Sequence, residues 1–324
     1  MNGNIFFERK GPFLVSEIFE NTHLNKKVYD IKNLKDSTIN DLTFLDKIDY
    51  INFAKSTKAS FCITTENLKS HLPKTCEAII VKNVLFELCK ATRKFYPNAD
   101  LDIPDKSLKT PKKLNYPKVR FGNNVLVGKK CKIGNNTYVG SNSVIEHNVI
   151  IGESCVIGSQ TVIRNSLIGN NVVIQDGSKV GLKGFGFIPL KEKNLRFPHI
   201  GKVIIMDNSE IGANCTIDRG SINDTIIGKN TFLDNQVHVA HNTVIGNNCM
   251  IAGQVGFAGS SIVGNNVSIG GQAGVSGHLK IGNHVKIGGG SGVIKDVKEG
   301  DVIMGYPAVP LKDFIRNKKK WMIQ

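Results

Sequence analysis

Histidine is the side chain of this sequence best suited to acid–base chemistry near neutral pH, and the chain contains eight. His238 and His241 lie three residues apart, Gly259 follows His241 by 18 residues, and His278 follows it by 37. An imidazole beside an available backbone N–H can act as a general base next to an oxyanion donor. These residues form such a site only if the fold stacks positions about 18 residues apart.

A six-residue hydrophobic period predicts that stacking. Between Phe121 and Val293 a branched or bulky apolar residue recurs at every sixth position over two long series, with one five-residue step from Ile163 to Ile168. Smaller residues precede these anchors by two positions, and Gly-Asn-Asn runs supply turns that tolerate positive φ. A fixed period of this kind indicates a solenoid, here a parallel β-helix with 18 residues in each triangular coil.

The predicted coils give the histidines a geometry. His241 comes two positions after the anchor Val239, so we expect it on an outward-facing corner, with His238 on the flat face before it. Gly259 is one coil further on and should lie directly beside His241. His278 is two coils and one residue away, roughly 10 Å at about 4.8 Å per strand. The alternative reading of His241 is a solvated turn residue.

Composition narrows the class of protein. Forty-two Lys and Arg against 27 Asp and Glu give a net charge of +15, which favours an acidic partner or a phosphorylated ligand. Aromatic residues are sparse and no nucleic-acid-binding motif is present, so nucleic acid is not expected. Four of the seven cysteines occupy small inward positions, and we expect them to fill the core rather than form disulfides or a metal site. With no long apolar segment or signal peptide, we expect a soluble, cytoplasmic protein with no transmembrane segment.

The chain divides into four predicted segments. Residues 1–98 form a small α/β domain, residues 99–118 a Pro- and Lys-rich linker, residues 119–304 the β-helix, and residues 305–324 a short basic helix that caps the last coil. Within the first segment the patterns predict helices at 13–21 and 84–96 and strands at 60–64 and 78–81.

The repeat has one long interruption, at residues 182–203. A loop of this length in a compact repeat is more often functional than not. It contains Gly184-Phe185-Gly186-Phe187 and the basic residues Lys191, Lys193 and Arg196. We interpret it as a flap over a ligand groove, because no strand-to-helix context supports a nucleotide-binding glycine motif.

Several motifs together resemble one enzyme family. They are Leu233 to Gly246, Ile217-Asp218-Arg219-Gly220, the Gly184 to Phe187 segment, Gly270-Gly271-Gln272, Gly277-His278, Asp41 to Asp46 with Tyr50, Asn83 to Phe86, and Phe95-Tyr96-Pro97. This combination is similar to the UDP-3-O-acylglucosamine N-acyltransferases of lipid A synthesis, over nearly the whole chain. The resemblance implies a left-handed parallel β-helix of hexapeptide repeats with an N-terminal uridine-binding domain.

The activity that the resemblance implies is an N-acyl transfer. An (R)-3-hydroxyacyl group moves from acyl carrier protein to the 2-amine of UDP-3-O-acylglucosamine. His241 matches the family's catalytic base, Asp234 matches the carboxylate that orients it, and Gly259 falls where related acyltransferases place an oxyanion donor. No cofactor is implied apart from the 4′-phosphopantetheine that the carrier protein brings.

Other positions match the family's substrate contacts. Phe44 and Tyr50 correspond to an aromatic pair that sandwiches uracil, where two rings gain stacking with a flat base. The family often has an asparagine between them, but this chain has Lys47, which could instead reach phosphate. Asn235 matches a residue near the sugar nucleotide, and His278 one that positions substrate or the thioester arm. Core packing is the alternative role for the aromatic pair.

The resemblance also implies partners. The basic residues Lys312, Arg316, Lys318, Lys319 and Lys320 could dock the acidic carrier protein, or form a solvated face. The family forms homotrimers with each active site between two solenoids, in the cytoplasm of Gram-negative bacteria. The acyl-chain length and the binding order are not encoded in any motif of the sequence.

Two other functions fit the same repeat. One is a hexapeptide acyltransferase of different specificity, acting on a hydroxyl group or using CoA, although the N-terminal domain is typical of the N-acyltransferases. The other is a zinc enzyme of the γ-carbonic-anhydrase kind, with His238, His241 and His278 as candidate ligands. Their spacing does not obviously converge on a tetrahedral site.

Overall fold

The computed structural model describes residues 4–20 and 22–321, with the side chains of 319–321 outside the description. The described chain separates into two compact units. Unit 1 comprises residues up to Asp102 together with 186–200 and 221–223, and unit 2 comprises 103–185, 201–220 and the residues from Asp224 onward. The fold is mainly β, as the sequence predicts.

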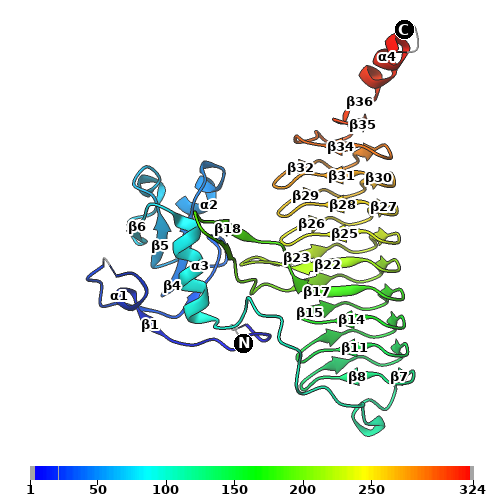
Figure 1. Cartoon of the computed structure of the whole chain (residues 1–324), viewed down its shortest axis with the longest axis horizontal. Coiled ribbons are helices and arrows are strands. Elements are labelled where there is room, and N and C mark those ends of the chain that lie inside the picture. Colours follow the sequence, from blue (N-terminus) through cyan, green and yellow to red (C-terminus); the bar gives the residue numbers. More distant parts are fainter. Residues whose placement is uncertain (1–3, 21, 322–324) are drawn as a thin grey trace. The chain divides into compact units, whose positions relative to one another are not determined.

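Unit 1 is built on a parallel four-stranded sheet. Its order is β3 (Asp30–Ile31), β4 (Asp41–Leu45), β5 (Phe61–Thr64) and β6 (Glu77–Ile80). The helix α3 (Val84–Phe95) covers one face, and its buried residues Leu88 and Phe95 join Leu42 and Ile63 in one apolar core (Figure 1). Asn83 caps this helix by accepting a 3.0 Å hydrogen bond from the Phe86 N–H. The predicted strands and the helix at 84–96 are therefore confirmed.

Short elements complete unit 1. They are β1 (Phe13–Leu14), α1 (Val15–Ile18), β2 (Lys27–Val28), η1 (Ile48–Tyr50), α2 (Ile51–Lys55) and η2 (Lys69–His71). The helix predicted at 13–21 is wrong in extent: Phe13 and Leu14 pair antiparallel with β2, the helix has four residues, and Asn21 lies outside the described residues. Phe13 packs edge-on against Phe95, with ring centroids 5.1 Å apart, a long-range contact that the local pattern does not contain.

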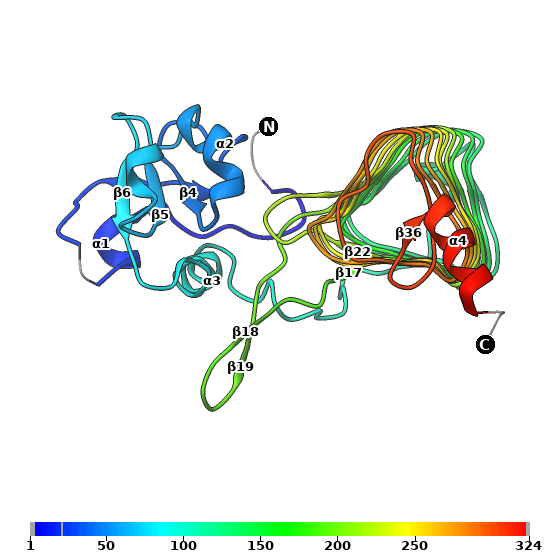
Figure 2. The same ribbon diagram turned by 90° about the horizontal axis from the view of Figure 1, so that it is seen from above.

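Unit 2 is a parallel β-helix whose coils superimpose into a triangular outline when seen end-on (Figure 2). Its three faces are sheets of short strands. Sheet 1 contains β7 (Arg120–Phe121), β10 (Tyr138–Val139), β13 (Val156–Ile157), β16 (Val173–Ile174), β21 (Glu210–Ile211), β24 (Phe232–Leu233), β27 (Met250–Ile251), β30 (Ser268–Ile269), β33 (Lys286–Ile287), β35 (Val302–Met304) and β36 (Val309–Pro310).

Sheets 2 and 3 form the other two faces. Sheet 2 contains β8 (Leu126–Val127), β11 (Val144–Ile145), β14 (Val162–Ile163), β17 (Lys179–Lys183), β22 (Thr216–Arg219), β25 (His238–Val239), β28 (Gly256–Phe257), β31 (Gly274–Val275) and β34 (Gly292–Val293). Sheet 3 contains β9 (Lys132–Ile133), β12 (Ile150–Ile151), β15 (Ser166–Ile168), β20 (Val203–Ile205), β23 (Thr225–Ile227), β26 (Val244–Ile245), β29 (Ile262–Val263) and β32 (Lys280–Ile281). We call the turns after these strands corners 1, 2 and 3.

The core of the β-helix is the predicted column of anchors. Ile145, Ile163 and Val239 are fully buried, as are the small residues two positions before many anchors. Many buried hydroxyls are tolerated because they donate to a carbonyl at the neighbouring corner, as Thr231 does to the Gly246 oxygen at 2.7 Å. All seven cysteines lie in the described chain as free thiols. Of the four predicted core residues, Cys155, Cys215 and Cys249 are fully buried, whereas Cys131 is only partly buried.

The corners have a repeated hydrogen-bonding pattern that bears on the site. Their last residue is in the left-handed region, with φ near 60° at Asn136, Asn242 and His278, for example. The middle residue of a corner points its N–H outside the strand ladder, and a side chain one coil further on commonly accepts it. Thus the N–H groups of Lys229, Asn247 and Asn265 donate to asparagine side chains at 2.7, 2.8 and 2.8 Å.

The predicted linker is hydrogen-bonded to the β-helix. Residues from Ile103 belong to unit 2 and include η3 (Lys113–Asn115). Asp105 accepts a 2.8 Å hydrogen bond from the N–H of His147, and the Ser107 hydroxyl accepts one of 2.9 Å from Lys129. The segment between 103 and 109 therefore caps corner N–H groups of the first coils rather than acting as a free linker.

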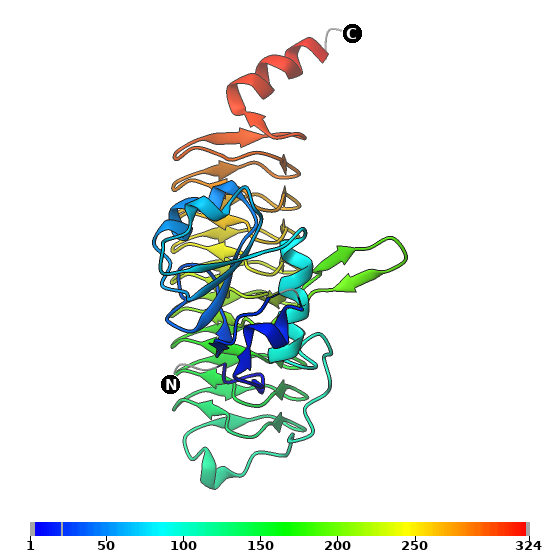
Figure 3. The ribbon, with the colours of Figure 1, turned by 90° about the vertical axis from the view of Figure 1, so that its left-hand side faces the viewer.

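The interruption at 182–203 contains a hairpin. Strands β18 (Phe187–Pro189) and β19 (Asn194–Arg196) pair antiparallel and form a two-stranded ribbon (Figure 3). Residues 186–200 belong to unit 1, where the Arg196 carbonyl accepts a 2.9 Å hydrogen bond from Arg93 of α3. The segment is therefore an extension of unit 1, and its interpretation as a flap over a groove stays a prediction.

The chain beyond the last coil forms β36 and α4 (Leu311–Trp321). Strand β36 pairs antiparallel with β35 and covers the edge of that strand, while α4 contacts both. Phe314 of α4 lies against Gly305. The predicted helix is confirmed. The side chains of Lys319 and Lys320, which the basic segment includes, lie outside the described residues.

Candidate active site at a corner of the β-helix

The candidate base His241 lies at corner 2, as its spacing predicts. It follows β25, and the next strands of the same sheet, β28 and β31, stack above it in register. The three successive corners are Ala240-His241-Asn242, Ala258-Gly259-Ser260 and Ser276-Gly277-His278. Their backbones are tied together, because Ser260 N–H donates to the His241 carbonyl at 2.9 Å and His278 N–H donates to the Gly259 carbonyl at 3.1 Å.

The imidazole of His241 lies directly on Gly259. A Cβ atom at position 259 would come within 2.7 Å of the ring Cε1 and 2.8 Å of Nε2. Any larger residue would displace the ring, so the glycine is required for this contact. The predicted proximity of the two residues is confirmed, and it brings the basic edge of the imidazole next to a backbone amide.

The N–H of Gly259 is available to a ligand. At many other corners an asparagine, aspartate or serine side chain of the following coil accepts the N–H of the middle residue. Here the following coil presents Gly277, which has no side chain, and no acceptor for the Gly259 N–H lies within the described chain. A donor that is neither satisfied nor deeply buried is suited to receive a developing oxyanion.

Asn242 determines which nitrogen of the neutral His241 ring carries the proton. The Asn242 Oδ1 atom lies 2.9 Å from His241 Nδ1. Because a carbonyl oxygen can only accept, Nδ1 carries the proton in the neutral ring and Nε2 holds the lone pair. The Asn242 N–H is itself held by Thr225 Oγ1 at 2.9 Å. Asn242 is not among the residues predicted for the site, although an asparagine directly after a corner histidine is a signal for it in the sequence.

His238 has a different environment. It lies on the flat face before the corner, and its Nδ1 is 2.8 Å from the Thr216 hydroxyl. Desolvation lowers the pKa of His238, a hydrogen bond with Thr216 opposes this shift, and the nearby His241 adds to it. His238 is therefore held in the neutral form beside His241.

His278 lies above His241 on the same corner. It occupies the last position of the corner two coils beyond Asn242, with φ of 62°. Two strand spacings correspond to about 10 Å along the β-helix. The rung of Gly259 lies between them, and Gly277 is the middle residue of the His278 rung, so the corner has no side chain at the middle position of these two rungs.

Asp234 does not orient His241 within one chain. It follows β24 at corner 1, whereas His241 follows β25 at corner 2, and one side of the coil separates corners by roughly 15–20 Å. Its Oδ1 accepts a 2.7 Å hydrogen bond from the Asn235 N–H, and its Oδ2 faces Gly253. The spacing of seven residues in a six-residue repeat necessarily places the pair on different corners. An intrachain pairing of the two residues is therefore wrong.

Asn235 has a capping role in the structure. Its side-chain oxygen accepts the Ala213 N–H at 2.7 Å. Asp234 and Asn235 also line a hollow of about 600 Å³ on the outer face of sheet 1, where Phe232 and Met250 supply apolar surface and Lys286 a positive charge. The predicted contact of Asn235 with a sugar nucleotide stays a prediction.

The aromatic pair lies at the carboxyl end of β4 in unit 1. Phe44 is half-buried and packs against the core, while Tyr50 ends η1 with 36% of its surface exposed. Desolvation and then the negative charges of Asp46 and Asp49 raise the pKa of Tyr50, so its hydroxyl stays protonated. Lys47 between them is exposed. The core contact of Phe44 supports the packing alternative for that residue. Its contact with uracil stays a prediction.

In the described part of the chain, no group of three or more His, Cys, Asp or Glu side chains is arranged to hold a metal ion. Within residues 4–20 and 22–321, none of the helices has the length and apolar character needed to span a bilayer.

Two family models match separate segments of the chain. A family model described as UDP-3-O-(3-hydroxymyristoyl) glucosamine N-acyltransferase matches residues 25–93, and a bacterial transferase hexapeptide model matches residues 130–165 and 224–259. The resemblance to the UDP-3-O-acylglucosamine N-acyltransferases is confirmed over residues 25–93, and the hexapeptide matches confirm the repeat. The second hexapeptide match includes His241 and Gly259.

Individual proteins with this activity in their names are also similar to part of the chain. The UDP-3-O-acylglucosamine N-acyltransferase of Agrobacterium fabrum is 51% identical over 77 residues, and that of Rhizobium etli is 53% identical over 77 residues. Each match covers 24% of this chain and 22% of the relative, so the alignments span about a fifth of the length of these relatives.

A solved structure supports the fold. The UDP-N-acetylglucosamine acyltransferase from Campylobacter jejuni aligns over 59% of this chain and 73% of its own, with a TM-score of 0.53 and 21% sequence identity. At this identity the likeness shows the β-helical fold alone.

Proposed function

We propose that this protein is an N-acyltransferase that moves an (R)-3-hydroxyacyl group from the phosphopantetheine arm of acyl carrier protein to the 2-amine of UDP-3-O-acylglucosamine. The observation that carries the proposal is the contact between the His241 imidazole and Gly259, whose N–H has no acceptor in the described chain. The family match at residues 25–93 supports the choice of acceptor.

The first step is attack of the sugar amine on the thioester. His241 Nε2 accepts a proton from the amine as its nitrogen forms a bond to the carbonyl carbon. The electron pair of the C=O double bond moves onto oxygen, where the Gly259 N–H stabilises the negative charge. A positioned general base of this kind typically contributes about 10²–10⁴-fold to the rate.

The second step breaks the C–S bond. The oxyanion re-forms the carbonyl, the pantetheine sulfur leaves with the bonding electrons, and the protonated His241 returns the proton to it. The products are an amide and a free thiol, and His241 is neutral again. Asn242 stabilises this cycle by holding Nδ1–H, which keeps Nε2 as the atom that accepts and returns the proton.

Unit 1 supplies the binding of the nucleotide in this proposal. Phe44 and Tyr50 stack on uracil, and Lys47, an exposed cation beside them, interacts with phosphate. Asn235 contacts the sugar nucleotide, and His278 positions the substrate or the thioester arm.

The proposed active unit is a homotrimer with sites between copies. His241 and Asp234 lie on different corners of one coil, so Asp234 can orient a catalytic imidazole only if it comes from a second copy of the chain. An interface between two β-helices brings a corner 1 and a corner 2 together without changing either chain.

The carrier protein is proposed to dock on α4. Lys312 and Lys318 are exposed cations on this helix, and Arg316 pairs with Asp313 at 2.8 Å. An excess of positive charge on one helix favours an acidic partner and accelerates its encounter with the enzyme.

The acceptor atom can be tested directly. Purified protein is incubated with 3-hydroxyacyl carrier protein and either UDP-3-O-acylglucosamine or UDP-N-acetylglucosamine, and products are analysed by mass spectrometry before and after mild alkali. The proposal predicts an alkali-stable added acyl group on the first acceptor alone, because amides resist mild alkali. An alkali-labile ester on the second acceptor would instead identify an O-acyltransferase.

A further inference from the structure

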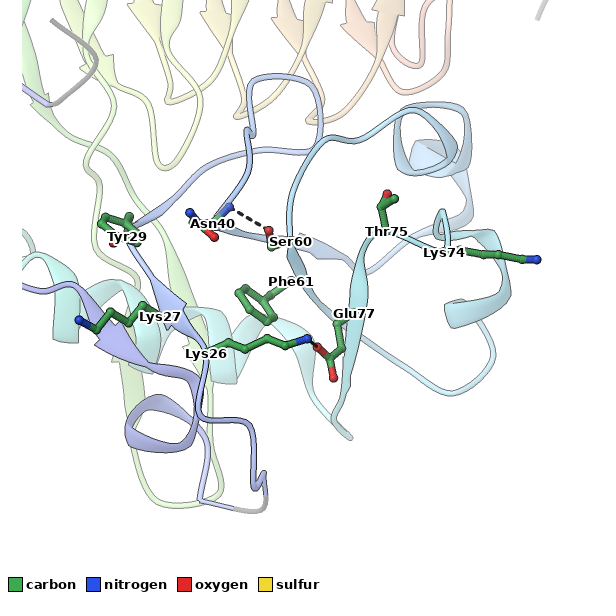
Figure 4. Close-up of a pocket in the computed structure, with 9 residues that line it drawn as sticks. All are labelled: Lys26, Lys27, Tyr29, Asn40, Ser60, Phe61, Lys74, Thr75 and Glu77. Atoms are coloured by element: carbon green, nitrogen blue, oxygen red, sulfur yellow. Dashed lines mark hydrogen bonds and ion pairs between the residues drawn. The ribbon is translucent and has the colours of Figure 1, made fainter.

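A second hollow lies at the opposite edge of the unit 1 sheet from the aromatic pair. It occupies about 610 Å³ at the amino-terminal ends of β4, β5 and β6, beside Asn40, Ser60 and Thr75 (Figure 4). Phe44 and Tyr50 lie instead at and beyond the carboxyl end of β4. The hollow shares none of its lining residues with the proposed transfer reaction.

The charges around this hollow are mostly positive. Its lining includes Lys26, Lys27 and Lys74 against the single carboxylate of Glu77. Glu77 is neutralised by Lys26, whose Nζ lies 3.0 Å from its Oε2. Lys27 and Lys74 stand on opposite sides of the hollow, and neither has an acidic partner in the described chain (Figure 4). Their ammonium groups point outward in Figure 4, so both side chains must rotate inward to meet an anion between them.

Neutral donors line the same hollow. The Asn40 side-chain amide and the Tyr29 and Thr75 hydroxyls make no hydrogen bond to the described residues. Ser60 Oγ accepts the Asn40 N–H at 2.8 Å and keeps its own proton to donate. The lining thus offers many donors, and its one carboxylate is already paired.

Aromatic surface adds a place for an organic group. Tyr29, which is 43% exposed, supplies this surface, whereas Phe61 lines the hollow but is only 2% exposed. A volume of about 610 Å³ exceeds what inorganic phosphate needs and falls in the range of small-molecule sites.

We propose that this hollow binds a soluble phosphorylated small molecule through its phosphate monoester group. Lys27 and Lys74 turn inward onto the dianion, the Ser60 and Thr75 hydroxyls and the Asn40 amide donate to its oxygens, and the organic part lies against Tyr29. This ligand site is separate from the acyl transfer, so either can be correct without the other.

The experiment is calorimetric titration of the full chain with glucose 1-phosphate, inorganic phosphate and glucose. We expect binding of both phosphates, tighter for the sugar phosphate, no binding of glucose, and affinity that falls as salt increases. Absence of binding by both phosphates would overturn the proposal. Binding to phosphatidic acid vesicles with none to glucose 1-phosphate would also overturn it, because the ligand would then be a lipid headgroup.

Matched variants place the binding in this hollow. We expect Lys27→Ala/Lys74→Ala to weaken the affinity for glucose 1-phosphate by about tenfold or more, since both cations of the lining without an acidic partner are lost. Lys35→Ala/Lys82→Ala removes the same charge from exposed positions outside the hollow and should leave the affinity within about twofold. Equal losses in the two variants would assign the binding to overall charge and reject this site.

A third variant changes the affinity in the opposite direction. Glu77→Gln removes the only carboxylate of the lining and frees Lys26, so the affinity for glucose 1-phosphate should rise severalfold. The Glu77 N–H bond to the Ser60 carbonyl, at 2.8 Å, is a backbone contact and remains. A decrease in affinity with an unchanged melting temperature would contradict the proposed arrangement.

Discussion

The ring of His241 rests on Gly259, with a hypothetical Cβ at position 259 only 2.7 Å from Cε1 and 2.8 Å from Nε2. One coil of the β-helix separates these residues, so the contact follows from the 18-residue repeat. The same repeat leaves Gly277 above Gly259 and removes the side chain that would otherwise accept its N–H. The corner thereby combines a base with an available donor.

Gly259→Ala tests this contact. The added methyl group must push the His241 ring away from the Gly259 N–H, and misplacing a catalytic group by about 1 Å can cost roughly 10²-fold in rate. We expect kcat to fall by about that factor with little change in melting temperature. Gly256→Ala is the matched control, because a Cβ at Gly256 meets no atom of the chain within 4 Å. Full activity of Gly259→Ala would remove the contact from the mechanism.

Complementation tests the assembly of the site from two copies. His241→Ala and Asp234→Asn proteins are each expected to be strongly impaired. In mixed trimers formed by coexpression, about one site in four should combine an intact His241 with an intact Asp234 from a neighbour. We therefore expect activity to reappear in the mixture, measured against either variant alone. If both residues acted within one chain, no site of the mixture would be complete and activity would stay absent.

Phe44→Leu tests the uracil stack. Leucine keeps apolar volume in the core of unit 1 but removes the ring, so KM for the nucleotide substrate should rise by about 3- to 10-fold while kcat changes little. Phe7→Leu, which also alters a half-buried phenylalanine against the same core, serves as the packing control. A KM that is unchanged, or raised equally by both variants, would return Phe44 to a packing role.

The pKa shift of His147 predicts a pH dependence of stability. Burial lowers the pKa of His147, Asp105 opposes this effect, and Lys129 and Arg164 add to it. The folded chain therefore binds this proton less tightly than the unfolded chain, whose histidine pKa is about 6.5. The free energy of unfolding therefore decreases as the pH falls through that value, and the decrease levels off below the pKa of the folded chain.

His147→Gln should accordingly lose less melting temperature between pH 7 and pH 5 than the wild type. His284→Gln, at an exposed corner position, is the control and should follow the wild-type curve. Parallel curves for His147→Gln and wild type would show that this imidazole makes no contribution to the acid sensitivity.

The β-helix could be predicted because its information is local and repeated. Each inward anchor such as Val239 or Ile245 specifies one strand, and the period alone fixes which residues stack. That is why the position of His241 beside Gly259, and His278 two coils above, followed from counting residues.

Other features depend on contacts that the pattern does not carry. Phe13 looks helical from its neighbours but pairs as a strand and packs on Phe95. The hairpin between 186 and 200 is held in unit 1 by Arg93 of α3. The family resemblance predicts that Asp234 orients His241, but the six-residue period places the two residues on different corners of one chain. The basic hollow near Lys27 and Lys74 collects residues from several strand ends and has no sequence motif.

The most direct measurement is transfer of a radiolabelled 3-hydroxyacyl group from acyl carrier protein to UDP-3-O-acylglucosamine by the wild-type protein and by His241→Ala. We expect turnover by the wild type and a loss of at least about 10²-fold in the variant, with oligomeric state and melting temperature retained, because a corner residue contributes little to the packed core. Full activity in a folded His241→Ala protein would contradict the role of this base. No transfer by the wild type would contradict the N-acyltransferase proposal itself.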